Sequence, residues 1–191
     1  PVFNPIDQVE NCGMAMNVRQ NIISLGTECD IVTNPNWGHV IKTRYIHKNT
    51  NQMFIRIDVN DDVIEACDPK SIDFEQYSLV VISDYCKGFL NEESIAYIAS
   101  QHDTVFLDTK RRLGPYCAAI KYIKINNYEF SKTEATITDD IEEKLIVTLG
   151  SRGCFHHGQT YPVSEVEIKD VTGAGDTFVA ALAVSYNHNP D

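Results

Sequence analysis

The residues with the most evident chemistry are the glycine-rich run Gly173-Ala174-Gly175 and the aspartate that follows it, Asp176. Three small residues at the start of a helix leave backbone N–H groups accessible, and the helix dipole adds positive potential there. Such a site binds anions. A carboxylate on the first turn lies beside the bound anion and can accept the proton of a hydroxyl that attacks a phosphoryl group. On composition alone, an ordinary glycine-rich helix start explains the run equally well, because short glycine motifs recur by chance.

A parallel sheet is expected to position this helix. Four short apolar segments rich in branched side chains read as buried strands: residues 78–83, 104–108, 120–125 and 144–149. Residues 91–101 lie between the first two and have the pattern of a helix, with Asn91 as the N-cap. Strand, helix and strand at this spacing favour an α/β fold with a mainly parallel central sheet flanked by helices.

The first third of the chain has a different pattern. Residues 17–25 have helical spacing of apolar side chains, and Gly26 is expected to close that helix. Residues 40–48 and 52–58 predict a β-hairpin, interpreted as a small flap of approximately 40–58 beside the main sheet. Apolar flap side chains favour a homodimer contact, and packing onto the sheet explains them about as well. These side chains are Tyr45, Ile46, Met53 and Phe54.

Composition excludes several classes of function. The chain has 191 residues, the length of one domain, and its 16 Lys and Arg against 27 Asp and Glu give a net charge of −11. This charge disfavours binding to nucleic acid and to anionic membranes. The longest apolar run, 178–184, is far shorter than the roughly 20 residues of a membrane span. The six cysteines are scattered singly, which favours reduced thiols and a cytoplasmic location.

The segment 170–178, Asp-Val-Thr-Gly-Ala-Gly-Asp-Thr-Phe, resembles the C-terminal signature of the PfkB family of carbohydrate kinases, which have the ribokinase-like fold. The resemblance implies that Asp176 is the catalytic base for a sugar hydroxyl. It also implies that Gly173, Ala174 and Gly175 cradle the transferring phosphate, and that Asp170 lies at the rim of the substrate pocket.

Two further segments resemble nucleotide-binding elements of this family in the same order. The segment 146–153 is similar to the strand and glycine loop along ATP, which implies ATP contacts for Thr148, Gly150 and Gly153. Asn126 and Glu129 resemble the Asn-x-x-Glu element associated with Mg²⁺ and phosphate positioning, with Glu129 as the metal ligand. From the residues alone, a strand-to-turn exit and helix capping by Asn126 remain the alternatives.

Within the family, the chain resembles the heptose-phosphate kinases of ADP-heptose synthesis. The resemblance lies in residues 83–88, in residues 108–110 and in the flap. A sugar that already carries a phosphate needs cations. The candidates are Lys42, Arg44, Arg56, Lys87 and Lys110, and for any single one a solvated surface role is the alternative. Asp84 together with Lys87 is the preferred pair among these residues.

The family's Gly-Gly-x-x-x-Asn substrate signature is similar to residues 12–17, which implies substrate contacts for Gly13 and Asn17. Here Cys12 replaces the first glycine, and the family's opening strand has no counterpart before Pro1. We therefore expect 1–191 to be a single, partial ribokinase-like kinase domain. Two hypotheses follow: an ATP-dependent kinase acting on a heptose 7-phosphate-like sugar, or a noncatalytic sugar- or nucleotide-binding remnant of such a kinase.

Overall fold

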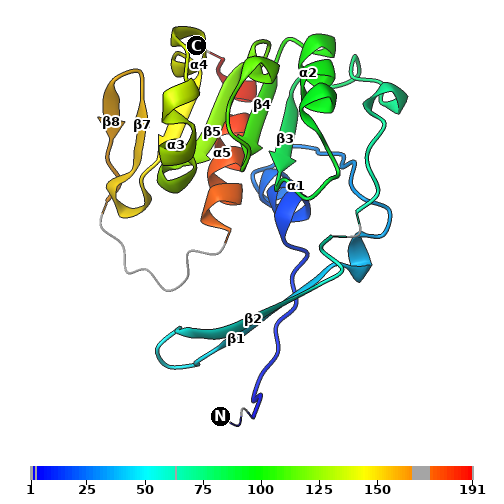
Figure 1. Ribbon diagram of the computed structural model, residues 1–191, viewed down its shortest axis with the longest axis vertical. Coiled ribbons are helices and arrows are strands. Elements are labelled where there is room, and N and C mark those ends of the chain that lie inside the picture. The colour runs from blue at the N-terminus through cyan, green and yellow to red at the C-terminus, as the bar shows by residue number, and fades with distance from the viewer. Residues whose placement is uncertain (1, 3, 63, 165–172, 191) are drawn as a thin grey trace.

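The chain forms two separate sheets, as the computed structural model shows for residues 2, 4–62, 64–164 and 173–190 (Figure 1). The main sheet has six strands in the order β3-β4-β5-β6-β7-β8. Its strands are β3 (Val80–Asp84), β4 (Val105–Thr109), β5 (Tyr122–Asn126), β6 (Leu145–Thr148), β7 (Cys154–His156) and β8 (Gln159–Tyr161). The first four are parallel, and the last two are antiparallel to their neighbours. The predicted mainly parallel sheet is therefore confirmed.

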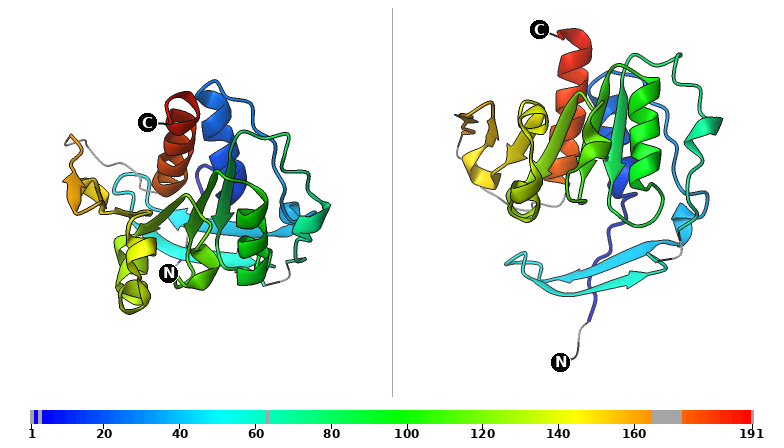
Figure 2. Two further views of the ribbon diagram at one scale, coloured as in Figure 1. Left: turned by 90° about the horizontal axis from the view of Figure 1, so that it is seen from above. Right: turned by 45° about the horizontal axis from the view of Figure 1, so that its top comes forward.

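Helices cover both faces of the main sheet. Figure 2 shows α1 and α5 side by side on one face, with α2, α3 and α4 on the other. The helices are α1 (Met14–Ser24), α2 (Glu92–Gln101), α3 (Asn127–Thr133), α4 (Asp139–Glu142) and α5 (Ala174–His188). Short 3₁₀ turns occupy Trp37–His39, Pro69–Ser71, Pro115–Cys117, Glu134–Thr136 and Gly150–Arg152. None of the helices in the described ranges has the length and hydropathy to cross a membrane.

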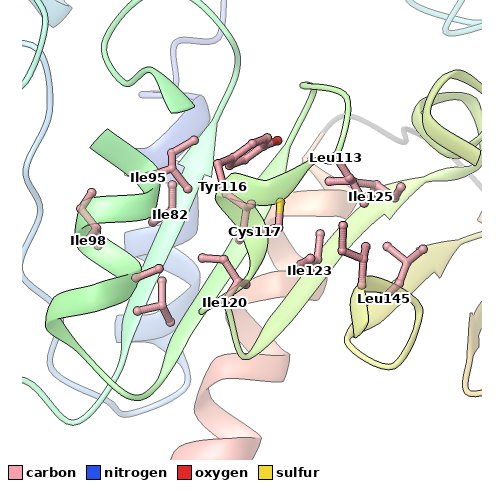
Figure 3. Packing of buried hydrophobic residues seen from close by; sticks show 14 of the residues in the cluster. Ile82, Ile95, Ile98, Leu113, Tyr116, Cys117, Ile120, Ile123, Ile125 and Leu145 are labelled. Carbon is pink, nitrogen blue, oxygen red and sulfur yellow. The ribbon is translucent and has the colours of Figure 1, made fainter. Parts of the chain in front are cut away.

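Two apolar clusters join these layers. The larger one covers the sheet face under α2, and it runs from Ile95 and Ile98 of that helix across Ile120 to Ile123 and Ile125 of β5 (Figure 3). The smaller one joins α1 to α5 through Val18, Ile22, Val179 and Ala180. Alternating side chains of each strand serve opposite faces, so every central strand contributes to both layers. This double coverage explains why these strands are apolar along nearly their whole length.

The predicted elements agree closely with the observed ones. Each of the four predicted strands lies within two residues of an observed strand. Asn91 caps α2 by accepting a hydrogen bond from the backbone N–H of Ser94 at 2.7 Å. The helix predicted at 17–25 begins earlier, at Met14, and Gly26 follows its C-cap with a φ of +87°. The β7–β8 hairpin was not predicted, because its three-residue strands are too short to produce a recognisable alternation.

The predicted flap is a separate antiparallel hairpin of β1 (Ile41–Ile46) and β2 (Met53–Val59), which extends beyond the main sheet in Figure 1. Cross-strand register places one set of mostly apolar residues on one face: Ile41, Thr43, Tyr45, Ile55, Ile57 and Val59. The other face carries Lys42, Arg44, Arg56 and Asp58, together with Phe54, which is 51% exposed. The apolar face is exposed, with 43% of Ile57 and 52% of Ile41 accessible to solvent.

Candidate active site

A polar pocket of about 180 Å³ lies where β3, β4 and β5 end and α5 begins. Parallel strands end at the same edge of their sheet, so residues far apart in the sequence meet there. The lining residues are Asp84, Tyr85, Asp108, Lys110, Lys124, Asn126, Glu129, Gly173, Gly175 and Asp176. The pocket therefore combines carboxylates, ammonium groups and a helix N-terminus.

Asp176 is buried on the first turn of α5 and is held from two directions. The Asn17 side chain donates a hydrogen bond to Oδ2 of Asp176 at 2.8 Å, and the Tyr85 hydroxyl donates to Oδ1 at 2.8 Å. Asn17 comes from α1, and Tyr85 follows β3 directly. Burial and the charge of Asp176 raise the pKa of the Tyr85 phenol far above its usual range, so Tyr85 is the donor at neutral pH.

The two glycines of the motif let other side chains approach the start of α5 closely. Gly173 is the N-cap of α5 with a φ of +81°, a left-handed conformation that favours glycine. A Cβ there would lie 2.7 Å from Nδ2 of Asn17. A Cβ on Gly175 would lie 2.7 Å from Nζ of Lys124. The start of α5 therefore approaches both an amide and an ammonium group, and the ammonium adds to the positive potential of the helix end.

Lys124 is a buried lysine in an otherwise apolar strand, and its partner is Asp108. The two residues are opposite each other in the β4–β5 register, and Nζ of Lys124 is 3.1 Å from Oδ2 of Asp108. Burial raises the pKa of Asp108 to about 6, and the carboxylates of Glu129 and Asp176 add to this rise, while Lys124 opposes it. The Asp108–Lys124 pair therefore brings charge to the pocket, and burial disfavours the ionised form of Asp108.

Asp84 and Lys87 each form an ion pair with a different residue and not with each other. Asp84 is buried and accepts from Nε of Arg111 at 2.7 Å and from the Thr109 hydroxyl at 2.9 Å. Lys87 pairs with Asp61, 2.7 Å away, and Asp61 also pairs with Lys42 at the base of the flap. Asp84 therefore braces the ends of β3 and β4, and the polar face of the hairpin is tied to the loop after β3.

Glu129 combines helix capping with a position in the pocket. Asn126 and Glu129 form a capping box at the start of α3, in which Asn126 accepts from the Glu129 backbone N–H and Oε2 of Glu129 accepts from that of Asn126. The other oxygen, Oε1, lies 3.6 Å from Nζ of Lys110. No group of three or more His, Cys, Asp and Glu side chains that could hold a metal ion exists among the described residues. Mg²⁺ is commonly held by one or two carboxylates plus substrate phosphates, and Glu129 fits that limited role.

Several other predicted site residues, Thr148, Gly150, Gly153 and Arg56, are not among the residues that line this pocket. Thr148 is the register partner of Asn126 at the end of β6, and Gly150 and Gly153 follow it. A Cβ on Gly153 would clash with the backbone carbonyl oxygen of Tyr161 in β8, so the packing of this hairpin also favours glycine here. Arg56 pairs with Asp58 on the flap.

At the N-terminal side, Gly13 is the N-cap of α1 and carries the helix that presents Asn17. Asp170 lies outside the described residues.

Sequence reasoning did not assign roles to Tyr85, Lys124, Asp108 or Arg111. For Lys124 a signal existed, because a lysine inside an apolar strand must find a partner for its charge. Tyr85 lies inside the segment 83–88 that carries the family resemblance, but nothing local indicates that its hydroxyl reaches Asp176, 91 residues away.

Comparison with known proteins gives a consistent family match. Residues 33–191 match the family model described as "pfkB family carbohydrate kinase". The bifunctional protein HldE of Vibrio vulnificus strain CMCP6 is 29% identical over 97% of this chain, and that of Hydrogenovibrio crunogenus is also 29% identical over 97%. The chain spans about half the length of these curated relatives, 49% in both cases.

Solved structures agree on the fold. The nucleoside kinase of Methanocaldococcus jannaschii, an archaeal member of the ribokinase family, superimposes with a TM-score of 0.52 at 20% identity, covering 78% of this chain and 54% of that one. The fructokinase of Vibrio cholerae O395, solved with fructose, ADP and calcium ion bound, has a TM-score of 0.50 at 14% identity, covering 90% of this chain and 66% of that one. The ribokinase-like fold is therefore shared.

Proposed function

We propose that this chain, which belongs to the pfkB family of carbohydrate kinases, transfers the γ-phosphoryl group of ATP to a hydroxyl of a sugar phosphate resembling heptose 7-phosphate. The observation that carries the proposal is the placement of Asp176. Its carboxylate is buried on the first turn of α5, inside a pocket that also contains Lys110, Lys124 and Glu129. A base beside a helix N-terminus and two ammonium groups is the arrangement that phosphoryl transfer requires.

In the proposed reaction, the sugar hydroxyl oxygen forms a bond to the γ-phosphorus while the bond from that phosphorus to the bridging oxygen of ADP breaks. Asp176 accepts the hydroxyl proton, and ADP leaves with the electron pair of the broken bond. The backbone N–H groups at Gly173 and Gly175 and the Lys124 ammonium line the same pocket and would stabilise the charge on the transferring group. The protein therefore contributes positioning and electrostatic stabilisation.

Mg²⁺ would arrive with ATP and neutralise charge on its phosphates. Glu129, through Oε1, is the residue in the pocket suited to hold it, since Oε2 is already engaged in the helix cap. Lys110 lies beside the same oxygen and can bind a phosphate of either substrate.

The phosphate already present on the sugar would be held from the flap side. Lys42, Arg44 and Arg56 share one face of the hairpin, and Arg44 and Arg56 are opposite each other in the register. Like charges facing across two strands destabilise a hairpin, and a bound phosphate relieves their repulsion. Lys42 links this face to Lys87 through Asp61, which supports a role for the flap at the substrate side of the pocket.

We also propose that the apolar face of the flap contacts a second copy of the chain. Four apolar side chains on that face are each more than two fifths exposed: Ile41, Ile55, Ile57 and Val59. An isolated two-stranded hairpin is marginally stable in water, and pairing two such faces removes their apolar area from solvent.

The test is ADP release from MgATP in the presence of sugar phosphates, with heptose 7-phosphate first. Turnover that falls at least about 100-fold in Asp176→Asn supports the kinase. Calorimetric titration with MgATP, alone and with the sugar phosphate, accompanies the assay. Saturable binding with no turnover in either protein contradicts the kinase and favours the noncatalytic binding remnant.

A further inference from the structure

Tyr85 contacts both the proposed base, Asp176, and the cation Lys110, which lies over its ring. Its hydroxyl donates to Oδ1 of Asp176 at 2.8 Å, and the Lys110 ammonium lies 4.8 Å from the centre of its ring. Lys110 in turn lies 3.6 Å from Oε1 of Glu129. One side chain at the end of β3 therefore contacts both the base and the cation nearest the capping carboxylate.

Asp176 has one donor on each carboxylate oxygen. Asn17 donates to Oδ2 from α1, and Tyr85 donates to Oδ1 from the other side of the pocket. A carboxylate has about four acceptor positions, so two remain for a substrate hydroxyl. Donors on both oxygens fix the rotation of the carboxylate about its Cβ–Cγ bond, which decides where the remaining lone pairs point.

We propose that Tyr85 is a positioning residue for Asp176, whose hydroxyl holds the carboxylate in the orientation that accepts the substrate proton. The inference rests on the proposed function, because it concerns the base of that reaction. Tyr85 need not touch the reacting atoms. Its effect passes through Asp176, so loss of the hydroxyl slows the chemical step and leaves substrate binding intact.

The ring and the hydroxyl of Tyr85 can be separated by substitution. Tyr85→Phe keeps the ring under Lys110 and removes the donor to Asp176, whereas Tyr85→Leu removes both. A matched control is Tyr77→Phe, because the Tyr77 hydroxyl also donates to an aspartate, Asp30 at 3.1 Å, through a solvent-exposed hydrogen bond outside the pocket. The control loses the same type of hydrogen bond outside the pocket.

The first measurement is steady-state turnover of the full chain with MgATP and heptose 7-phosphate. We expect Tyr85→Phe to lower kcat about 10- to 100-fold, the effect of one hydrogen bond to a charged group, with KM for both substrates changed less than about twofold. Tyr77→Phe should match the wild type. In Tyr85→Leu, KM for a phosphate-bearing substrate should also rise, because Lys110 loses its aromatic support.

The second measurement does not depend on turnover. Urea unfolding of the wild type, Tyr85→Phe, Asp176→Ala and the double variant forms a double-mutant cycle. Tyr85→Phe should shift the unfolding midpoint in the wild-type background and shift it much less when Asp176 is absent. An unchanged kcat in Tyr85→Phe beside an active wild type overturns the role of Tyr85. A wild type that shows this coupling and no turnover overturns the proposed function and supports the contact.

Discussion

The pocket at the end of the main sheet and the β1–β2 hairpin both contain ion pairs, but the side chains of these pairs differ in their exposure to solvent. The Asp84 side chain is 4% exposed and that of Arg111 is 16% exposed, whereas the Arg56 side chain of the flap is 43% exposed. The Asp84–Arg111 and Asp108–Lys124 pairs each join two neighbouring strand ends or strands and have lost most of their hydration, whereas Lys110 of the Lys110–Glu129 pair is still 48% exposed. On the flap, water remains available to replace a lost partner.

The apolar residues of the two regions have the reverse distribution. Beneath the pocket, the apolar side chains of the strands are enclosed by helices on both faces, and Ile123 and Ile125 are fully buried. On the hairpin, Ile41 and Ile57 face solvent. The comparison indicates that removing a pocket charge should cost stability, whereas removing a flap charge should cost little, so the proposed roles of the flap in ligand and partner binding can be tested separately from folding.

The largest effect is expected from Asp84→Ala. This change leaves the guanidinium of Arg111 without its carboxylate in a mostly buried position and should lower the free energy of unfolding by about 3–5 kcal/mol. Urea unfolding of both proteins measures it. Adding Arg111→Met to the same variant should recover part of the loss, because the unpaired charge is removed. A loss below about 1 kcal/mol would show that Asp84 is no more important than a surface ion pair.

Asp108 should make stability depend on pH in the direction opposite to that of most carboxylates. Its pKa is about 6 in the folded chain, against 3.8 ordinarily, so between pH 4 and 6 the folded state holds a proton that the unfolded state has released. Stability from this group is therefore lost as pH rises through that window, by about 3 kcal/mol in total. Comparing unfolding of Asp108→Asn and the wild type across pH 4 to 7 isolates this contribution.

Asp58 on the flap provides the contrasting control for that experiment. Its hydrogen bond from Arg56 lowers the pKa of Asp58 to about 2. Its stabilising contribution is therefore present above pH 4 and is lost as pH falls toward 2. Asp58→Asn and Asp108→Asn should change the pH dependence of stability in opposite directions. The same direction for both would contradict the contrast between the two regions.

Ile57→Glu tests the proposed dimer contact of the flap. A charge on the exposed apolar face should weaken self-association at least about 10-fold, because burial of an isoleucine contributes about 1.5–3 kcal/mol. Sedimentation velocity over a concentration series measures this change. The monomer itself should lose little stability, since Ile57 is exposed within one chain. A wild type that remains monomeric at all concentrations contradicts the contact.

The smallest effect on stability is expected from Arg56→Ala. Its pair with Asp58 is exposed to water, so its loss should leave the free energy of unfolding nearly unchanged. If the flap holds the sugar's phosphate, KM for the sugar phosphate should nevertheless rise while KM for ATP stays the same. An unchanged KM for both substrates would remove Arg56 from the substrate site.

Much of the fold could be predicted because the relevant signals are local. Short runs of branched residues ended by polar ones predicted the four parallel strands, and Asn91 predicted the start of α2. Two candidate strands on either side of a short turn, at 40–48 and 52–58, predicted the flap. The string at Gly173 and Asp176 indicated a helix start beside a carboxylate. Each of these features depends on periodicity or on capping within one segment, which the sequence contains in full.

Only the tertiary structure decided which groups meet. Lys124 faces Asp108 because the strands pair in one particular register, and Lys87 finds Asp61 rather than Asp84. Asn17 reaches Asp176 across 159 residues. Such partners depend on how distant segments pack, since a separation of a few ångströms decides whether a hydrogen bond or an ion pair exists, and no local pattern contains that distance.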